Sequence, residues 1–173
     1  MAETEDLTLE ETAENTLEGK YLTFALSNEA YGVAILTVRE IIGITEITSV
    51  PKTPEFVKGV INLRGKVIPV IDLRLRFDLA QKEYDEQTCI IVVEALDGDG
   101  ASTEMGVIVD SVDEVHAFTA QEIEPAPALG SEVETQFILG MGKTENNVTI
   151  LLDIDKVLTD SEMSMLKSSA NSE

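Results

Sequence analysis

Short runs of hydrophobic residues, many of them alternating with polar ones, recur along most of this chain. Alternation with a period of two is typical of β-strands that bury one face. Polar or glycine-containing turns separate neighbouring runs, among them Asn28-Glu29, Arg64-Gly65 and Asn146-Asn147. We therefore predict an all-β protein made largely of hairpins, with strands at residues 21–26, 31–35, 57–63, 67–71, 89–96, 105–109, 137–141 and 148–152.

Helical segments are predicted to be few and short. Residues 36–42 fit one or two helical turns. Asp72 and Asp153 each stand before an apolar-rich segment, where an aspartate caps a helix by accepting a backbone hydrogen bond. We therefore expect a short helix after Asp72 and a C-terminal helix from Asp153 through Leu166.

The middle of the chain is repeated near its end. Residues 56–73 return in weakened form, 81 positions later, as residues 137–154. Each copy starts with a phenylalanine, carries a glycine three residues on (Gly59 and Gly140) and ends in an aspartate followed by an aliphatic residue. Because the two glycines recur at the same place, we predict a structural role for both, at a backbone position that excludes a side chain.

An earlier segment is also repeated, since residues 31–41 recur as residues 105–115 at an offset of 74. The two offsets differ by seven, which implies one insertion in the second copy; chance similarity is the alternative. With about five strands in each half, the sequence predicts two small closed barrels, because closure removes exposed strand edges. We expect lobes at roughly 19–80 and 86–158, with the boundary and any exchange of strands left open.

The charge of the chain limits its partners. Among 173 residues, 12 are lysine or arginine and 33 are aspartate or glutamate, so the net charge is -21. Nucleic acids and anionic membranes repel such a chain, and we expect protein partners with neutral or basic faces. Residues 1–18 hold no lysine or arginine and few apolar residues, which predicts a flexible acidic tail, and residues 169–173 are predicted to be a flexible end.

Other features indicate a cytoplasmic protein without a cofactor. No secretory signal and no apolar run of about 20 residues are found, so we expect no membrane insertion. Cys89 and His116 are the only residues of their types, and neither has a metal-binding partner at suitable spacing. We therefore expect no metal, no cofactor and no catalytic residue.

Three motifs carry a resemblance to a known family. Residues 31–41 (YGVAILTVREI), 50–77 (VPKTPEFVKGVINLRGKVIPVIDLRLRF) and 119–127 (TAQEIEPAP) resemble the CheW-like family of chemotaxis coupling proteins, and the likeness spans residues 21 to 166. The resemblance implies two five-stranded SH3-like β-barrels packed on a shared hydrophobic core.

The resemblance also implies a function. CheW-like proteins are non-enzymatic adaptors that couple the cytoplasmic tip of chemoreceptors to the regulatory domain of the histidine kinase CheA, and they join rings in receptor arrays. By this resemblance the chain is cytoplasmic and recruited to membrane-associated arrays. A coupling module of a non-flagellar chemosensory pathway is one alternative, and a small β-barrel enzyme using acidic residues such as Asp72 and Asp110 is a remote one.

Arg64 is the central candidate for receptor binding. It stands in a hairpin turn, from which a guanidinium reaches a carboxylate through two parallel hydrogen bonds, and Glu40 is the partner we predict. The resemblance implies that this link fixes the segment at 36–42 against the hairpin. The alternative is a surface arginine that makes no lasting contact.

Aliphatic residues from the two repeats complete the predicted receptor site. Val38 and Ile41 have Val112 and Val115 as their repeat equivalents, and such residues on facing lobes suit a groove for one amphipathic helix. The alternative is that these residues are core. The predicted receptor-binding residues are Ile35, Val38, Glu40, Ile41, Arg64, Gly106, Val112 and Val115.

The insertion in the second repeat is the candidate kinase or ring contact. It carries the aliphatic residues Ile123 and Leu129 on a connection stiffened by prolines. The resemblance implies that this loop contacts the kinase, although Glu124 occupies a position where relatives often carry a basic residue. The alternative is a loop that folds its aliphatic residues back onto its own barrel.

Overall fold

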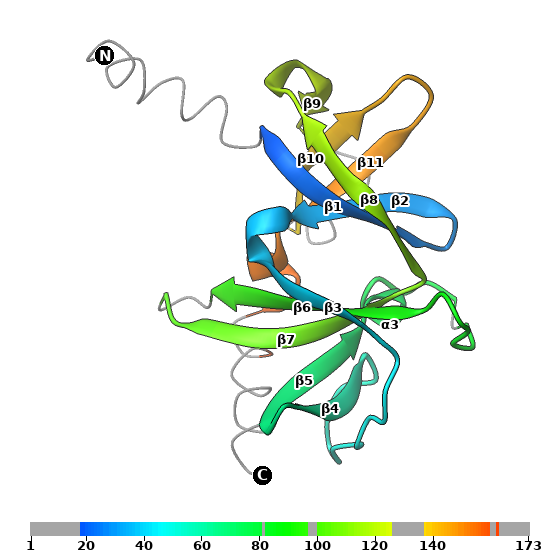
Figure 1. Ribbon diagram of the computed structural model, residues 1–173, viewed down its shortest axis with the longest axis vertical. Coiled ribbons are helices and arrows are strands. Elements are labelled where there is room, and N and C mark those ends of the chain that lie inside the picture. Colours follow the sequence, from blue (N-terminus) through cyan, green and yellow to red (C-terminus); the bar gives the residue numbers. More distant parts are fainter. Residues whose placement is uncertain (1–17, 81, 97–99, 126–136, 160–161, 163–173) are drawn as a thin grey trace.

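A computed structural model describes residues 18–80, 82–96, 100–125, 137–159 and 162. The protein is mostly β, as predicted, with its strands in two sheets (Figure 1). The acidic tail predicted for residues 1–18 lies outside the described residues except for Glu18, as do the flexible end and nearly all of the predicted C-terminal helix beyond 159. The strands are β1 (Gly19–Leu26), β2 (Glu29–Ala34), β3 (Val38–Gly43), β4 (Val57–Leu63), β5 (Lys66–Asp72), β6 (Cys89–Leu96), β7 (Ser102–Val109), β8 (Ser111–Phe118), β9 (Ile123–Glu124), β10 (Ile138–Lys143) and β11 (Val148–Leu152).

Each sheet combines strands from both repeats. One sheet has the order β8-β1-β2-β11-β10-β9, and the other has the order β3-β6-β7-β5-β4. We call the corresponding SH3-like barrels the first barrel and the second barrel; they fill the upper and lower parts of Figure 1. The strands are exchanged between the repeats, so the barrels do not follow the expected lobe ranges of 19–80 and 86–158.

The repeat at an offset of 81 is a structural repeat of one hairpin. In β4–β5, Val57 faces Ile71 and the register shifts before Gly59; in β10–β11, Ile138 faces Leu152 and the register shifts before Gly140. The hairpins also end alike. The amide nitrogens of Asp72 and Asp153 donate hydrogen bonds of 2.8 Å to the carbonyl oxygens of Phe56 and Phe137, respectively.

Gly59 has the structural role predicted for it. Its φ is +142°, and a Cβ atom there would lie 2.0 Å from the carbonyl oxygen of Thr48. Thr48 exchanges two backbone hydrogen bonds of 2.9 Å with Val60, and this bridge joins the continuation of β3 to β4. Gly59 therefore permits the close backbone approach that closes the second barrel. In the first barrel, β9 follows β8 and pairs with β10.

The repeat at an offset of 74 is also structural. Gly32 of β2 pairs in parallel with Leu151 of β11, and Gly106 of β7 pairs in parallel with Val70 of β5. Thr23 of β1 faces Gly32 just as Val92 of β6 faces Gly106. The paired registers thus give residues of one barrel equivalents in the other.

A shared hydrophobic core joins the two barrels. Leu22, Phe24 and Val33 of the first barrel pack in one cluster with Val93 and Met105 of the second. The second barrel also has its own aliphatic interior, and the first barrel has a smaller cluster around Tyr21, Phe118 and Leu151. Burial of apolar surface across the junction holds the barrels together.

Two local predictions need correction. Residues 36–42 are not a helix, because a short 3-10 turn, η1 (Ile35–Thr37), is followed at once by β3. Residues of β3 alternate between partly buried and exposed, and the strand pairs with β6. Strand β8 is absent from the predicted strands, because Asp113, Glu114 and His116 interrupt its run of apolar residues.

The two aspartate caps are present. The side chain of Asp72 accepts a hydrogen bond of 2.9 Å from the amide of Arg74 at the start of α3 (Leu73–Arg76). Asp153 accepts one of 3.1 Å from the amide of Asp155 at η4 (Ile154–Lys156). Both caps form where a strand ends and a helical turn begins, but the helix predicted from Asp153 is only a 3-10 turn that ends at Lys156, and residues 157–159 do not continue it.

Candidate functional site

Arg64 pairs with Glu40, as the sequence predicts. Arg64 lies in the β4–β5 turn with φ 55°, next to Gly65 with φ 87°, and Asn62 fixes the turn by accepting a 2.7 Å hydrogen bond from the Gly65 amide. The Arg64 Nη1 atom donates to Glu40 Oε2 over 3.2 Å, and Nη2 donates to Oε1. The hydrogen bonds from Arg64 lower the pKa of Glu40. The turn is therefore joined to β3 by a two-bond carboxylate–guanidinium contact.

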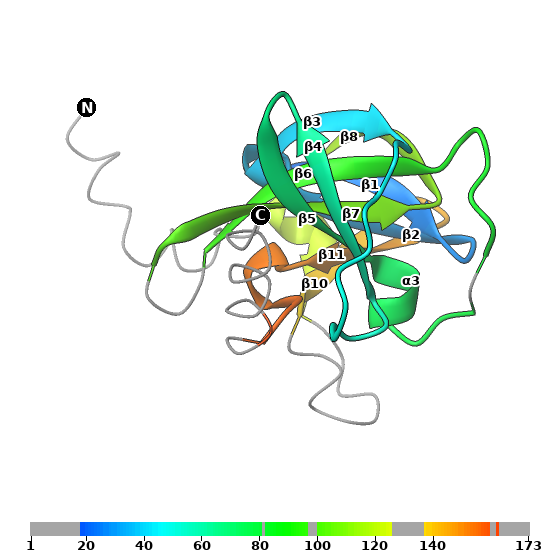
Figure 2. The same cartoon turned by 90° about the horizontal axis from the view of Figure 1, so that it is seen from below.

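The predicted aliphatic residues divide into two groups. Ile35, Val38 and Val112 are partly buried and pack against the shared core, which agrees with the core alternative for Val38 and Val112. Ile41 and Val115 are exposed at 44% and 49%, so the core alternative is wrong for this pair. They occupy equivalent places on β3 and β8, and both strands lie toward the top of the view in Figure 2.

Leu36 is a candidate residue that the sequence prediction missed. It is the most exposed of the large hydrophobic residues described, at 86%, and it lies in η1 between the two barrels. The sequence repeat could have indicated that Leu36 is exposed. The equivalent of Leu36 at an offset of 74 is Asp110, a polar residue, so the position does not require burial. Leu36, Ile41 and Val115 form what we call the exposed aliphatic set.

Gly106 does not belong to an exposed surface. It is buried within the second barrel, where a Cβ atom would lie 2.7 Å from Ile90 Cγ2 and 3.4 Å from Val70 Cγ2. This position therefore shapes the sheet, and a direct contact between Gly106 and a receptor, as predicted, does not fit its burial.

The predicted kinase loop is only partly described. Ile123 is partly buried and packs against the cluster of Tyr21, Phe118 and Leu151, which matches the alternative of a residue folded back onto its own barrel. Glu124 is exposed and accepts a hydrogen bond of 2.5 Å from Lys143 Nζ. Leu129 lies outside the described residues.

A largely buried ion pair lies where the chain crosses between the barrels. Arg74 of α3 donates from Nε and Nη2 to the carboxylate of Asp110 over 2.7 and 2.5 Å, and the two side chains are exposed at only 12% and 14%. Asp110 also accepts from the amide of Ser27, in the β1–β2 turn, over 2.9 Å. Burial raises the pKa of Asp110, but the hydrogen bonds from Arg74 and Ser27 outweigh it and lower the pKa.

The acidic residues named for the enzyme alternative are engaged in structural contacts. The carboxylate of buried Asp72 accepts from the Arg74 amide and, over 2.8 Å, from the Tyr84 hydroxyl. Burial and this hydrogen bond raise the pKa of Tyr84. Asp110 is held by Arg74 and Ser27. The observed contacts therefore give both carboxylates a structural role.

Two searches of the described residues bear on other kinds of site. Groups of three or more His, Cys, Asp or Glu side chains arranged to hold a metal ion are absent from the part of the chain that the structure describes. Within that part, no helix is long and apolar enough to cross a bilayer.

The fold and the surface together define a class of protein. A duplicated pair of barrels that exposes aliphatic residues on two equivalent edge strands, beside a fixed arginine–glutamate pair, is typical of a scaffold that binds other proteins.

Comparison with known proteins gives the family. Residues 20–162 match the model of the CheW-like domain family. The chain is 38% identical over 165 residues to the chemotaxis protein CheW of Klebsiella aerogenes, covering 95% of this chain and 96% of that protein. It is 36% identical over 148 residues to the chemotaxis protein CheW of Bacillus subtilis, covering 85% and 91%.

A solved structure agrees with these relatives. The crystal structure of the scaffolding protein TtCheW from Thermoanaerobacter tengcongensis matches with a TM-score of 0.75 and 38% identity, covering 84% of this chain and 97% of that one. The chain belongs to the CheW-like family, and its role is that of a chemotaxis scaffold or adaptor.

Proposed function

We propose that this protein couples chemoreceptors to the histidine kinase CheA in the cytoplasm, within receptor arrays. The observation that carries the proposal is the two-bond contact of Arg64 with Glu40 on the edge strand β3. It holds β3 in place next to exposed aliphatic residues in a chain of the CheW-like family. Fixing the geometry before binding reduces the entropy lost when a partner docks.

The receptor contact in this proposal is an amphipathic helix laid across β3 and β8. Ile41 and Val115 offer one aliphatic residue from each barrel, and Leu36 lies between the barrels on η1. A helix that presents apolar residues at intervals of three and four positions reaches such a set along one face. The net charge of -21 favours a receptor segment with neutral or basic residues around that apolar face.

The kinase contact is proposed for the insertion of the second repeat. Exposed Glu124, paired with Lys143, lies at the start of this insertion on β9, which is the outermost strand of its sheet. Within the proposal, the receptor and the kinase use separate surfaces, so one adaptor binds both at once.

The test is reconstitution of the purified chain with a chemoreceptor cytoplasmic fragment and a CheA-type kinase. Arg64→Asp should abolish receptor-dependent kinase autophosphorylation while circular dichroism stays unchanged, because Arg64 is a well-exposed turn residue. Lys66→Asp is the matched control, since it reverses a charge in the same hairpin and breaks the exposed pair with Glu104 instead. Equal autophosphorylation with Arg64→Asp and wild type would contradict the proposal.

A further inference from the structure

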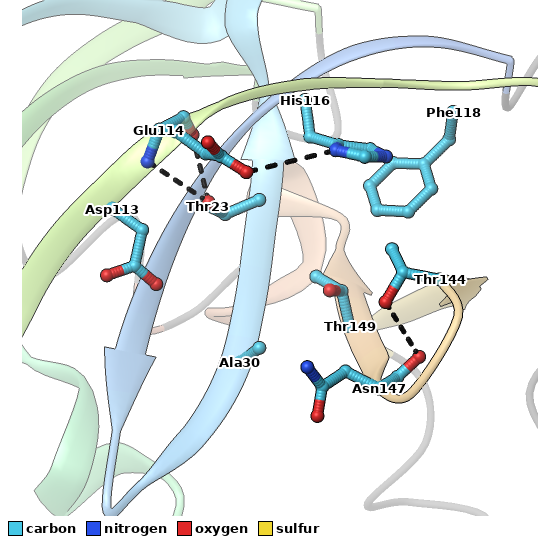
Figure 3. Close-up of a pocket in the computed structure, with 9 residues that line it drawn as sticks. All are labelled: Thr23, Ala30, Asp113, Glu114, His116, Phe118, Thr144, Asn147 and Thr149. Atoms are coloured by element: carbon cyan, nitrogen blue, oxygen red, sulfur yellow. Dashed lines mark hydrogen bonds and ion pairs between the residues drawn. The ribbon is translucent and has the colours of Figure 1, made fainter.

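A pocket in the first barrel is lined by polar residues, and the threonines among them have aliphatic equivalents in the second barrel. Its volume is about 280 Å³, and residues of β1, β2, β8 and the β10–β11 hairpin line it (Figure 3). We call it the threonine pocket and define it by Thr23, Thr144, Thr149, Asp113, Glu114 and His116. None of these residues belongs to the predicted receptor or kinase surfaces.

The positions of the second barrel that are equivalent to Thr23 and Thr149 hold aliphatic side chains. Thr149 faces Gly142 just as Ile68 faces Ile61, and Thr23 is equivalent to Val92. Ile68 and Val92 belong to the closed interior cluster of the second barrel. The same backbone therefore accepts aliphatic side chains at these two positions, although in the first barrel the Thr23 hydroxyl is bonded to the backbone of Glu114.

Thr149 supplies the observation that indicates a ligand. The residue is only 5% exposed and lines the pocket, and among the described contacts its hydroxyl has no hydrogen-bond partner. Among the described residues, a side-chain oxygen that is fully enclosed and has no hydrogen-bond partner occurs only at Thr103. The Thr149 oxygen is therefore not fully enclosed, and a ligand in the pocket can reach it. Figure 3 shows it on the side of Ala30 opposite to Asp113. A hydroxyl that has no partner among the described contacts and is reached from the pocket is available to a ligand that enters it.

The acidic residues around the pocket favour a positively charged ligand. Asp113 and Glu114 are its acidic lining residues, with no lysine or arginine among the described residues that line it. The Glu114 carboxylate lies 4.0 Å from His116 Nδ1, while the Asp113 carboxylate makes no hydrogen bond or ion pair among the described contacts. Carboxylate, hydroxyl and amide oxygens together match the donors of an ammonium or guanidinium group.

The shape of the surface favours a cation that belongs to a peptide chain. A second hollow adjoins the pocket and shares Ala30, Asp113 and Asn147 with it, and it continues to Asn28 and Glu29 at the β1–β2 turn. This second hollow also has no basic residue among its described lining. Two joined hollows give room for an extended segment, which a single small cation does not fill.

We propose that the threonine pocket binds a lysine or arginine side chain from a basic segment of a protein partner, with Thr149 and Asp113 as its main acceptors. The pocket shares strand β8 with the proposed receptor contact but uses different residues of it, Asp113, Glu114 and His116 in place of Val115. Failure of one proposal would leave the other unchanged.

The test titrates the isotopically labelled full chain with the peptide acetyl-Gly-Lys-Gly-Lys-Gly-amide, followed by NMR. Shift changes should concentrate at Thr23, Ala30 and Thr149, and the same peptide with both lysines acetylated should produce none. Asp113→Asn and Thr149→Val should each weaken the apparent affinity about ten-fold, as expected for losing one hydrogen bond to a charged group. Asp113 is exposed, so its variant should fold normally.

Glu55→Gln is the matched control, because it removes an exposed charge far in sequence from the pocket and should leave the affinity unchanged. Shift changes spread over the acidic surface, or unaffected by both pocket variants, would overturn the proposal. A titration with spermidine tests whether a free cation binds the pocket as well as a peptide side chain does. If spermidine reproduces the same shifts with equal or higher affinity, the assignment to a protein segment is overturned.

Discussion

The interiors of the two barrels differ although their backbones pair in the same way. Strand pairs β4–β5 and β10–β11 share one register with an offset of 81, including the shift before the repeated glycine of each copy. The side chains that fill the interiors of the two barrels differ. The second barrel contains Ile42, Ile61, Leu63, Ile68 and Val92, where the first has His116, Gly142, Thr144, Thr149 and Thr23.

Phe118 compensates for part of this difference. A Cβ atom at Gly142 would lie 2.6 Å from the Phe118 ring, so that ring occupies the space that Ile61 fills in the second barrel. The first barrel is therefore filled by one aromatic side chain and leaves a polar pocket beside it. Duplication has kept the backbone hydrogen bonding, which is required at every residue, while interior side chains changed as far as packing allowed.

The two crossings between barrels differ in a similar way. Asp110 joins β7 to β8 and is held by Arg74, whereas its repeat equivalent Leu36, between β2 and β3, is exposed. One crossing thus stabilises the junction, and the other offers an apolar side chain to a partner.

The largest effect is expected from Gly59→Ala, which would break the closure of the second barrel alone. The new Cβ would collide with the Thr48 carbonyl, and the residue would remain in a backbone region that L-residues avoid. We expect the free energy of unfolding to fall by about 4 kcal/mol in urea denaturation. Gly43→Ala is the control, because nothing lies within 4 Å of the place that its Cβ would take. Equal stability of the two variants would refute the role given to Gly59.

Asp110→Ala should remove the clamp at one crossing. It leaves the largely buried Arg74 without its partner, and we expect a loss of about 3 kcal/mol at neutral pH. Because folding lowers the pKa of Asp110, the stabilisation is present above the ordinary carboxyl pKa of about 4 and disappears as the pH falls through the folded value. The difference in unfolding free energy between wild type and variant should therefore shrink in acid. A difference that grows below pH 4 would contradict this account, and the exposed Asp113→Ala should show neither effect.

Val92→Thr would place in the second barrel the hydroxyl group that Thr23 supplies at the equivalent position of the first. The change keeps the side-chain shape and places a hydroxyl at a position that is 1% exposed, among aliphatic neighbours. We expect the free energy of unfolding to drop by about 2 kcal/mol in urea titration. Val92→Ala serves as a comparison for lost volume. A neutral Val92→Thr would mean that the second barrel tolerates polar groups as well as the first does.

The reverse change, Thr149→Val, should have the smallest effect and the opposite sign. It removes a hydroxyl that has no partner among the described contacts, so stability should stay equal or rise by up to about 1 kcal/mol. Differential scanning calorimetry measures the shift. A clear loss of stability would show that the Thr149 hydroxyl has a structural partner, and the argument for a ligand would then fail.

Local features of the fold were predictable from the sequence. The β4–β5 hairpin, its Arg64-Gly65 turn and the pairing of Arg64 with Glu40 all depend on neighbouring residues or on complementary charges in a recognisable motif. The expected helix at 36–42 failed because β3 gains its hydrogen bonds from β6, about 50 residues away, which local periodicity does not reveal.

Features that depend on long-range pairing were not predictable. Exchange of strands between repeats leaves each repeat's own pattern unchanged, since a strand alternates in the same way whichever barrel it joins. Exposure of Ile41 and Val115 also depends on which strands lie at the sheet edges, and both belong to edge strands β3 and β8. The sequence pattern alone left open whether these two residues line a receptor groove or belong to the core.

The central claim is that the Arg64–Glu40 contact holds the surface through which the protein couples receptor to kinase. The most direct measurement is receptor-dependent kinase autophosphorylation with Arg64→Asp, with Glu40→Arg and with the double variant Glu40→Arg/Arg64→Asp. Each single variant places like charges together and should abolish coupling, while the double variant recreates the attraction and should recover part of it. Coupling by Arg64→Asp at the wild-type level, with the protein folded by circular dichroism, would contradict the claim.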